Sequence, residues 1–266
     1  MDPHNKEVLK SIFSWHRIDD LSEDEIYKAT KKMDVNSKPD ISLDCSWGYF
    51  KKCTVLSSEK KPILFFKYVR EKFFEEVLGL HLVRHFLDRK LGFYDYICGV
   101  YPKRRKEIPF LLTTYEEGKH IGNYDLKDFK YELGRQYCVH EILSLYDVED
   151  RHFIVREDHS LCRIDFGRSF ENPHREYLGF QDYLGHKKID FLDTEFQRGY
   201  NHEKEIVRKN LGNKKRALIN TIASIKSLTY DRIMVFNPDR FANRIIDHWS
   251  RIGFLKYADL EDFAWI

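Results

Sequence analysis

Two acidic residues, Asp147 and Asp165, lie at the two ends of a short predicted β-hairpin. Its first predicted strand is Phe153 to Val155, its second runs from Leu161 to Ile164, and a polar turn separates them. Because the strands of a hairpin lie side by side, we expect both carboxylates at one rim. Carboxylate oxygens are ligands that Mg²⁺ prefers, so this rim suits a site that holds Mg²⁺ and a phosphoryl group.

The segment Asp165-Phe166-Gly167 matches the D-F-G motif, and the region resembles the protein-kinase-like superfamily. In that superfamily a catalytic-loop aspartate is followed five positions later by a metal-binding asparagine, and D-F-G comes after a hairpin. Asp147 and His152 have this spacing, and His152 directly precedes Phe-Ile-Val, where kinases have N-I-L. The resemblance implies that Asp147 is the catalytic base and that Asp165 binds the metal ion.

A second register of the catalytic loop begins at Asp150. Asp150-Arg151-His152 resembles the D-R-H of phosphoinositide 3-kinase-like enzymes, but Val155, five positions later, cannot bind a metal ion. We therefore favour Asp147. The pattern D-x-x-x-x-H-F-[LI]-[LV] also resembles the loop of bacterial lipopolysaccharide-core sugar kinases, in which His takes the place of Asn. That likeness covers nine residues and indicates an atypical kinase rather than a sugar substrate. Imidazole is softer than the oxygen ligands of Mg²⁺, so His152 has three open roles: binding metal, contacting phosphate or orienting the loop.

Lys67 is a charged residue inside the apolar strand F-F-K-Y-V, where it needs a partner. It resembles the kinase lysine that grips the α- and β-phosphates of ATP. No G-x-G-x-x-G precedes it, and only Gly48 in C-S-W-G-Y is expected to let the backbone approach phosphate. The predicted strands of this region are Ile41 to Gly48, Tyr49 to Leu56 and Pro62 to Val69.

An amphipathic helix is predicted from Phe73 to Arg89, and Glu76 lies on its apolar face. A carboxylate there can pair with Lys67, as the helix glutamate of kinases does. The neighbouring Glu75 remains an alternative partner.

Two further strands are predicted from Tyr94 to Tyr101 and from Phe110 to Tyr115. The second belongs to P-F-L-L-T-T-Y-E-E-G, which resembles the strand that leads into the hinge of a kinase. By that likeness Thr113 is the gatekeeper, and Thr114 and Glu116 offer backbone groups to adenine.

The remaining predicted elements are helical. Residues 1–39 are expected to form a helical extension that packs on the main domain. The predicted helices are Glu7 to Trp15, Ser22 to Met33, Leu126 to Leu145, Glu203 to Ser227 with a break near Gly212, and one capped by Asn237 that reaches Arg251.

Composition excludes several classes of protein. The chain has 266 residues, of which 42% are hydrophobic, and its net charge of +2 gives no global signal for nucleic acid or membrane. Five dispersed cysteines indicate free thiols in a reducing compartment, and no apolar run reaches membrane-spanning length. We therefore expect a cytoplasmic protein without a membrane span. No P-loop motif and no hydrolase nucleophile motif is present.

Together these features predict an α+β, two-lobed, protein-kinase-like fold. The expected divisions are an extension over 1–39, a small antiparallel β-sheet lobe with one helix over 40–116, and a mainly helical lobe over 117–266. The resemblance implies ATP with Mg²⁺, or with Mn²⁺, and transfer of the γ-phosphoryl group to a hydroxyl of protein, small molecule, glycan or RNA. The alternative is a pseudokinase, a nucleotide-binding or scaffold module without turnover.

Overall fold

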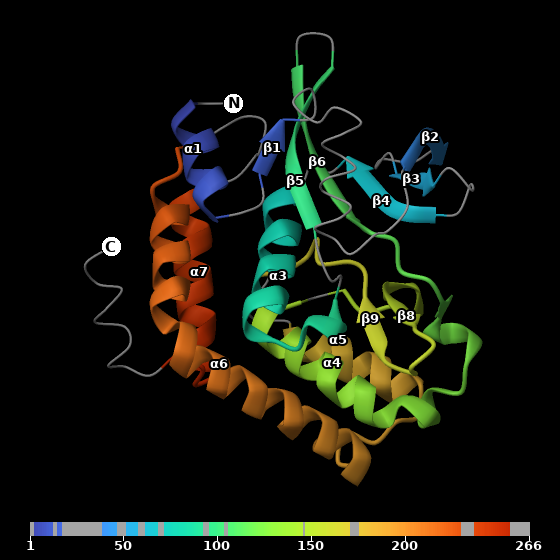
Figure 1. The fold of residues 1–266 in the computed structure, drawn as a ribbon. Helices are drawn as coiled ribbons and strands as arrows, with labels where there is room; N and C mark the ends of the chain where they lie inside the picture. The colour runs from blue at the N-terminus through green and yellow to red at the C-terminus, as the bar shows by residue number, and fades with distance from the viewer. Residues whose placement is uncertain are drawn as a thin grey trace.

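The computed structural model describes residues 3–12, 15–17, 39–46, 52–57, 62–68, 72–92, 96–103, 106–145, 147–170, 176–229 and 237–255. Within these ranges the chain is α+β, as predicted, with the larger sheet at the top of Figure 1 and most helices below it. Gly48 lies outside the described residues, so its predicted approach to phosphate stays a prediction.

The larger sheet has six strands in the order β1-β5-β6-β4-β3-β2. Neighbouring strands in this sheet are antiparallel except for the edge pair β1 and β5. These two strands are parallel, with Trp15 opposite Cys98. The antiparallel sheet predicted for residues 40–116 is therefore found, and the parallel strand belongs to the segment 1–39, which was expected to be helical. The strands are β1 (Trp15–Arg17), β2 (Pro39–Ser46), β3 (Lys52–Ser57), β4 (Pro62–Tyr68), β5 (Tyr96–Lys103) and β6 (Lys106–Thr114).

The N-terminal helix α1 (Pro3–Ile12) begins and ends earlier in the chain than the predicted helix from Glu7 to Trp15. Trp15, expected at its end, instead begins β1. Pairing with the free edge of β5 satisfies the backbone of this segment, and such a tertiary contact outweighs weak helical spacing. The segment also packs on the rest of the chain, because Leu9 is buried and the Asn5 side chain donates to the carbonyl of Thr229 at 2.9 Å.

The smaller sheet contains the predicted hairpin, which is confirmed. Strands β8 (Phe153–Val155) and β9 (Leu161–Arg163) pair antiparallel, with Phe153 opposite Arg163. A third strand, β7 (Lys119–His120), joins β8 and was not predicted, since two residues carry no period-2 pattern.

Helix α3 (Phe73–Phe86) begins where the sequence predicts and ends three residues earlier. It is less amphipathic than expected, because most of its residues are buried. A helix that is apolar on most sides lies inside a core rather than on its surface. Its apolar residues share one hydrophobic cluster with Phe166 and with residues of the C-terminal helices.

The remaining helices lie in the lower part and along the left side of Figure 1. The predicted break at Gly212 does not occur: one helix runs through it, because a single glycine costs only about 1 kcal/mol and Val207 and Leu218 are buried on either side. The predicted Asn237 cap is confirmed, since its side chain accepts the Arg240 N–H at 2.9 Å. The helices are α4 (Lys130–Leu143), α5 (Glu176–His186), α6 (Thr194–Lys226) and α7 (Pro238–Arg251), with 3₁₀ turns η2 (Arg89–Leu91), η3 (Ile121–Asn123), η4 (Leu126–Phe129) and η5 (Asp150–His152).

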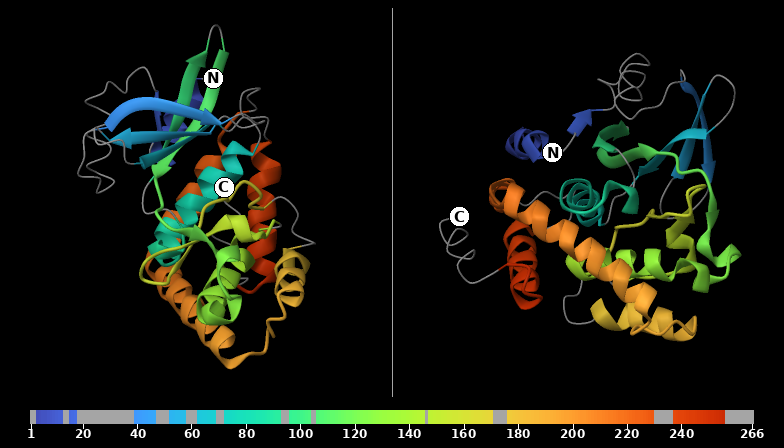
Figure 2. Two further views of the ribbon diagram at one scale, coloured as in Figure 1. Left: turned by 90° about the vertical axis from the view of Figure 1, so that its right-hand side faces the viewer. Right: turned by 60° about the horizontal axis from the view of Figure 1, so that its bottom comes forward.

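Helices α4 and α6 cross at two glycines, and Figure 2 shows the long α6 passing α4. A Cβ atom on Gly134 would overlap the carbonyl oxygen of Phe196, and one on Gly199 would overlap that of Tyr131. The two backbones are therefore in direct contact. This contact fixes α4, whose C-terminal end leads into the segment that carries Asp147.

Two sequence expectations about the whole chain are tested in part. Among the described residues Cys98, Cys138 and Cys162 are free and buried, as predicted. No helix in the ranges given above combines the length and the apolar character needed to cross a bilayer.

Candidate active site

Lys67 on β4 and Glu76 on α3 form a buried ion pair. The Lys67 Nζ atom lies 2.8 Å from both carboxylate oxygens of Glu76, and the two residues are 7% and 2% exposed. Burial alone would lower the pKa of Lys67, but the charges of Glu76 and Asp165 outweigh it and raise the pKa. The lysine is therefore charged at neutral pH. The geometry brings Glu76 to the lysine, as one of the two sequence alternatives predicts.

Asp165 follows β9 and lies beside this pair. Its Oδ1 atom is 3.9 Å from Lys67 Nζ and accepts the Gly167 N–H at 3.0 Å. Burial would raise the pKa of Asp165, but Lys67 and the Gly167 N–H lower it below its usual value. The Asp165 side chain is 36% exposed. The site thus holds an ionised carboxylate that solvent can reach, next to a buried lysine.

A glycine lets α3 approach the segment that carries Asp165. A Cβ atom on Gly79 would lie 2.7 Å from Ser169 Oγ and 2.9 Å from Phe166 Cβ. Gly79 is three positions after Glu76, so both residues lie on the same face of α3. Close packing at Gly79 therefore positions Glu76 against Lys67 and Asp165.

We expect Gly79→Ala to destabilise the protein by about 1–3 kcal/mol, as overpacking of a core does. Phe166 Cβ cannot rotate away, so α3 must shift, and the Lys67–Glu76 pair should shift with it. Urea unfolding measures the loss of stability. Gly212→Ala in α6 is the matched control, since its Cβ meets nothing within 4 Å; it should stabilise the protein by roughly 0.4–1 kcal/mol. Equal unfolding midpoints for the two variants would show that α3 does not pack this tightly.

Arg163 connects the two segments that carry Asp147 and Asp165. Its guanidinium donates to the backbone carbonyl of Asp165 at 2.7 Å and to that of Asp147 at 2.6 Å. The residue is 2% exposed, and burial lowers its pKa to about 10 despite the two aspartates, so it remains charged at neutral pH. Sequence reasoning missed Arg163. The signal was available, because a charge inside the apolar strand L-C-R-I is the same feature that identified Lys67.

The two candidate bases have different surroundings. Both carboxylate oxygens of Asp150 have partners: Oδ1 accepts the Tyr183 hydroxyl at 2.8 Å, and Oδ2 pairs with Lys187 at 2.5 Å. The Asp147 side chain is 34% exposed, and its Oδ2 lies 3.6 Å from Arg168 Nε. Asp150 therefore contacts α5 and the residue that follows it, whereas Asp147 lies beside the residue that follows Asp165-Phe166-Gly167.

His152 is 5% exposed and lies at the base of the hairpin, where its carbonyl accepts the Ile164 N–H at 2.9 Å. Its buried Nδ1 atom has no hydrogen-bond partner among the described residues. Burial and Arg163 lower the pKa of His152, against the opposing effect of nearby carboxylates, so the ring is neutral at pH 7. A neutral imidazole has a lone pair that can bind a metal ion.

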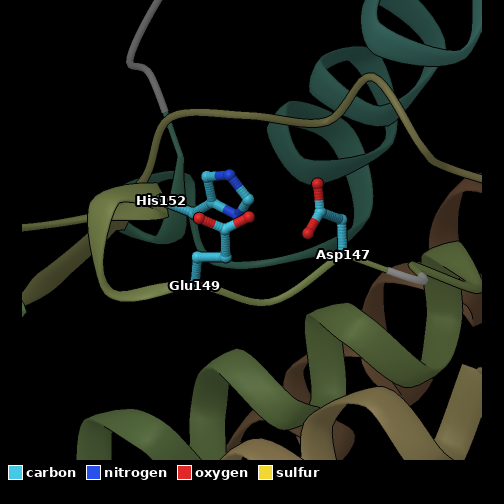
Figure 3. Close-up of side chains that lie close together, drawn as sticks. All are labelled: Asp147, Glu149 and His152. Carbon is cyan, nitrogen blue, oxygen red and sulfur yellow. The ribbon is translucent and has the colours of Figure 1, made fainter.

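One ligand atom from each of Asp147, Glu149 and His152 lies within 4.8 Å of the others (Figure 3). Glu149 was not a candidate in the sequence. Its position two residues after Asp147 and three before His152 was visible there, but the spacing alone does not show that a loop turns these side chains together.

The predicted hinge follows β6, which ends at Thr114. Thr113 and Thr114 are buried, and their hydroxyls have no hydrogen-bond partner in the described part of the chain. The Glu116 carboxylate accepts from Arg156 Nε at 2.8 Å, so its side chain connects this loop to the β8–β9 hairpin. The predicted backbone contacts of Thr114 and Glu116 with adenine stay predictions.

Comparison with known proteins adds little to this geometry. No family model matches the chain, and no curated protein matches it. Among solved structures, a MAP kinase from Leishmania major is similar with a TM-score of 0.35 and 12% sequence identity, over 91% of this chain and 90% of that one. Because this TM-score is low, the function is argued from the site alone.

Proposed function

We propose that this chain has a two-lobed kinase-like fold and is an ATP-dependent phosphotransferase with a hydroxyl acceptor. The observation that carries the proposal is the convergence of Lys67, Glu76 and Asp165 from a strand, a helix and the end of a hairpin. Lys67 Nζ is 2.8 Å from Glu76 and 3.9 Å from Asp165. A buried, charged lysine beside an accessible carboxylate suits the binding of phosphate and a divalent cation.

The proposed reaction forms a bond between the acceptor oxygen and the γ-phosphorus and breaks the bond to the β–γ bridging oxygen, whose electrons leave with ADP. Asp147 orients the acceptor hydroxyl and takes its proton on the carboxylate. Lys67, held by Glu76, positions the phosphates. Phosphoryl transfer depends mainly on positioning and charge neutralisation, so these side chains supply what the protein must provide.

Two of the residues at this site are suitable ligands for a divalent metal ion. Asp165 offers an ionised oxygen ligand with a 36% exposed side chain, and His152 offers a neutral ring nitrogen. We propose these two residues as metal ligands. Mg²⁺ prefers oxygen, whereas imidazole also suits transition metals, so Mn²⁺ is the alternative ion. When bound, the ion would neutralise charge on the phosphates.

The rival proposal is a pseudokinase that binds nucleotide without turnover. His152 favours it, because an imidazole takes the place of the amide oxygen that the resemblance leads one to expect. The retention of Lys67, Asp147 and Asp165 argues against it. Transfer of radiolabelled phosphate from ATP to fractionated protein, RNA and metabolite pools separates the two functions and also identifies the class of acceptor.

The first test of the proposal is nucleotide binding. We expect Mg·ATP to raise the Tm of the parent protein and Asp165→Asn to abolish the part of this shift that requires Mg²⁺. Because Asp165 lies at a rim, its replacement should leave the unliganded Tm within a few degrees of the parent. Lys209→Met, on the exposed face of α6, is the control and should retain the full shift. A parent protein without any shift at millimolar Mg·ATP would contradict the proposed function.

A further inference from the structure

We propose that Asp147, Glu149 and His152 form a binding site for a first-row transition-metal ion. This site binds its ion in the absence of nucleotide. One ligand atom from each residue lies within 4.8 Å of the others. Adjacent ligand atoms at roughly 2.0–2.2 Å from one ion are about 3.0–3.6 Å apart, so the Asp147 and Glu149 side chains must move inwards by about 1 Å to bind it together with His152. Asp165 is not a member of this group. Without nucleotide, the ion would therefore be held without Asp165. His152 is the ligand that this site shares with the ion proposed for the nucleotide complex, so one ion would occupy His152 at a time.

The imidazole of His152 supplies the observation that separates this cluster from ordinary surface acids. His152 is 5% exposed, and its Nδ1 atom is buried without a hydrogen-bond partner among the described residues. A buried polar atom without a partner is destabilising, and ligation of a metal ion would satisfy it. Figure 3 shows the ring beside the Glu149 carboxylate. The main chain of His152 is also held in place, because its carbonyl accepts the Ile164 N–H.

Two arginines lie beside the carboxylates of Glu149 and Asp147, and both arginine side chains are exposed to solvent. Arg151 contacts Glu149 at 2.6 Å and Arg168 contacts Asp147 at 3.6 Å. Their side chains are 70% and 43% exposed, and exposed ion pairs of this kind contribute little stability. A divalent ion can therefore displace Arg151 at small cost. This competition makes a specific prediction, since removal of Arg151 should strengthen metal binding rather than weaken it.

The ligand set determines the class of ion. Two carboxylates and one imidazole combine hard oxygen and intermediate nitrogen donors, which suits Mn²⁺, Fe²⁺ and Zn²⁺ better than Mg²⁺. Mn²⁺ is the practical probe because it is paramagnetic and air-stable. We expect it to bind at least about tenfold more tightly than Mg²⁺.

The experiment titrates the nucleotide-free protein into Mn²⁺ and follows the free-ion signal by electron paramagnetic resonance. We expect one Mn²⁺ per chain, with an electron spin-echo modulation from one directly bound ¹⁴N nucleus. Glu149→Gln should weaken binding by roughly tenfold or more, because even the loss of an outer partner of a metal ligand commonly has this effect. His152→Asn should remove the ¹⁴N modulation. Arg151→Gln should bind more tightly than the parent, because a competing cation is removed. Asp165→Asn should lose less affinity than Glu149→Gln, and the exposed Lys209→Met on α6 should bind within about twofold of the parent.

Several results would overturn the inference. In the titration, the free Mn²⁺ signal would stay unchanged with excess protein. In the spin-echo measurement, the parent would bind Mn²⁺ without ¹⁴N modulation. Among the variants, Asp165→Asn would lose binding while Glu149→Gln would not. Glu149 is on the surface, so Glu149→Gln keeps the test valid even if the buried His152 variant fails to fold.

A consequence for turnover rests on the proposed function. A metal ion at this site occupies Asp147, so phosphoryl transfer at saturating Mg·ATP should fall as Mn²⁺ fills the site. Arg151→Gln should then be inhibited at lower Mn²⁺ concentration than the parent. If no transfer occurs under any condition, the proposed function fails, while the metal site is still decided by the spectroscopic titration.

Discussion

Asp147→Asn is expected to reduce the kcat of phosphoryl transfer by roughly 10²–10⁴-fold and to leave the Kd of Mg·ATP within about twofold of the parent value. Asparagine keeps the size of the side chain but cannot accept the proton of the acceptor hydroxyl. The loop itself should not move, because Arg163 holds the backbone carbonyl of residue 147 at 2.6 Å. Slow ATP hydrolysis, with water as acceptor, serves as the assay before the acceptor is known, and calorimetry measures the affinity for nucleotide.

Asp150→Asn is the matched control three residues away. The substitution weakens contacts with Tyr183 and Lys187, so we expect a loss of stability of about 1 kcal/mol or less. Its kcat should stay within about threefold of the parent, because Asp150 takes part in no proposed proton transfer. The reverse order of the two kcat values would assign the catalytic base to Asp150 and reject the Asp147 register. Equal, small effects would favour a nucleotide-binding protein without turnover.

Local patterns predicted much of the candidate site. Lys67 was found because a charge between Phe65, Phe66 and Val69 is costly without a partner. The hairpin was found because two short apolar runs enclose a polar turn. In each case the information lies within a few neighbouring residues, so no knowledge of the fold was needed. The roles of these residues remain predictions, since only chemistry and ligand binding test them.

Other features depend on contacts between distant segments. The parallel pairing of Trp15–Arg17 with β5 joins residues about eighty positions apart, and nothing in the three residues W-H-R selects that partner. The direction of the Glu149 side chain depends on how the loop turns before η5. Arg163 is a different case: its charge in a strand was visible, but its partners are backbone carbonyls, which carry no sequence signal.

A buried cluster of charges connects α4, α6 and the end of α3. The Arg135 guanidinium contacts Glu203 at 3.1 Å and Asp88 at 2.5 Å, and the Asp88 N–H donates to Glu203 Oε1 at 2.7 Å. Arg135 is 6% exposed and Glu203 is fully buried. Burial raises the pKa of Glu203, while the Asp88 N–H and Arg135 act in the opposite direction. Arg135 thus supplies a positive counter-charge to this buried carboxylate.

Arg135→Met is therefore expected to lower the free energy of unfolding by about 3–5 kcal/mol, because it leaves Glu203 buried without a counter-charge. Urea unfolding at pH 7 measures this loss. The double variant Arg135→Met/Glu203→Gln should be more stable than Arg135→Met by roughly 1–3 kcal/mol, since it removes the uncompensated charge.

The pH dependence of Arg135→Met gives the decisive control. Without the arginine, the pKa of Glu203 in the folded protein rises further above its unfolded value, so the folded state binds a proton that the unfolded state does not. Stability should then increase as the pH falls from 7 towards the ordinary carboxyl pKa of about 4.3. Arg135→Met/Glu203→Gln should lack this increase. If both variants lose equal stability with the same pH profile, the loss comes from packing of the arginine stem, and the ion cluster is not what joins these helices.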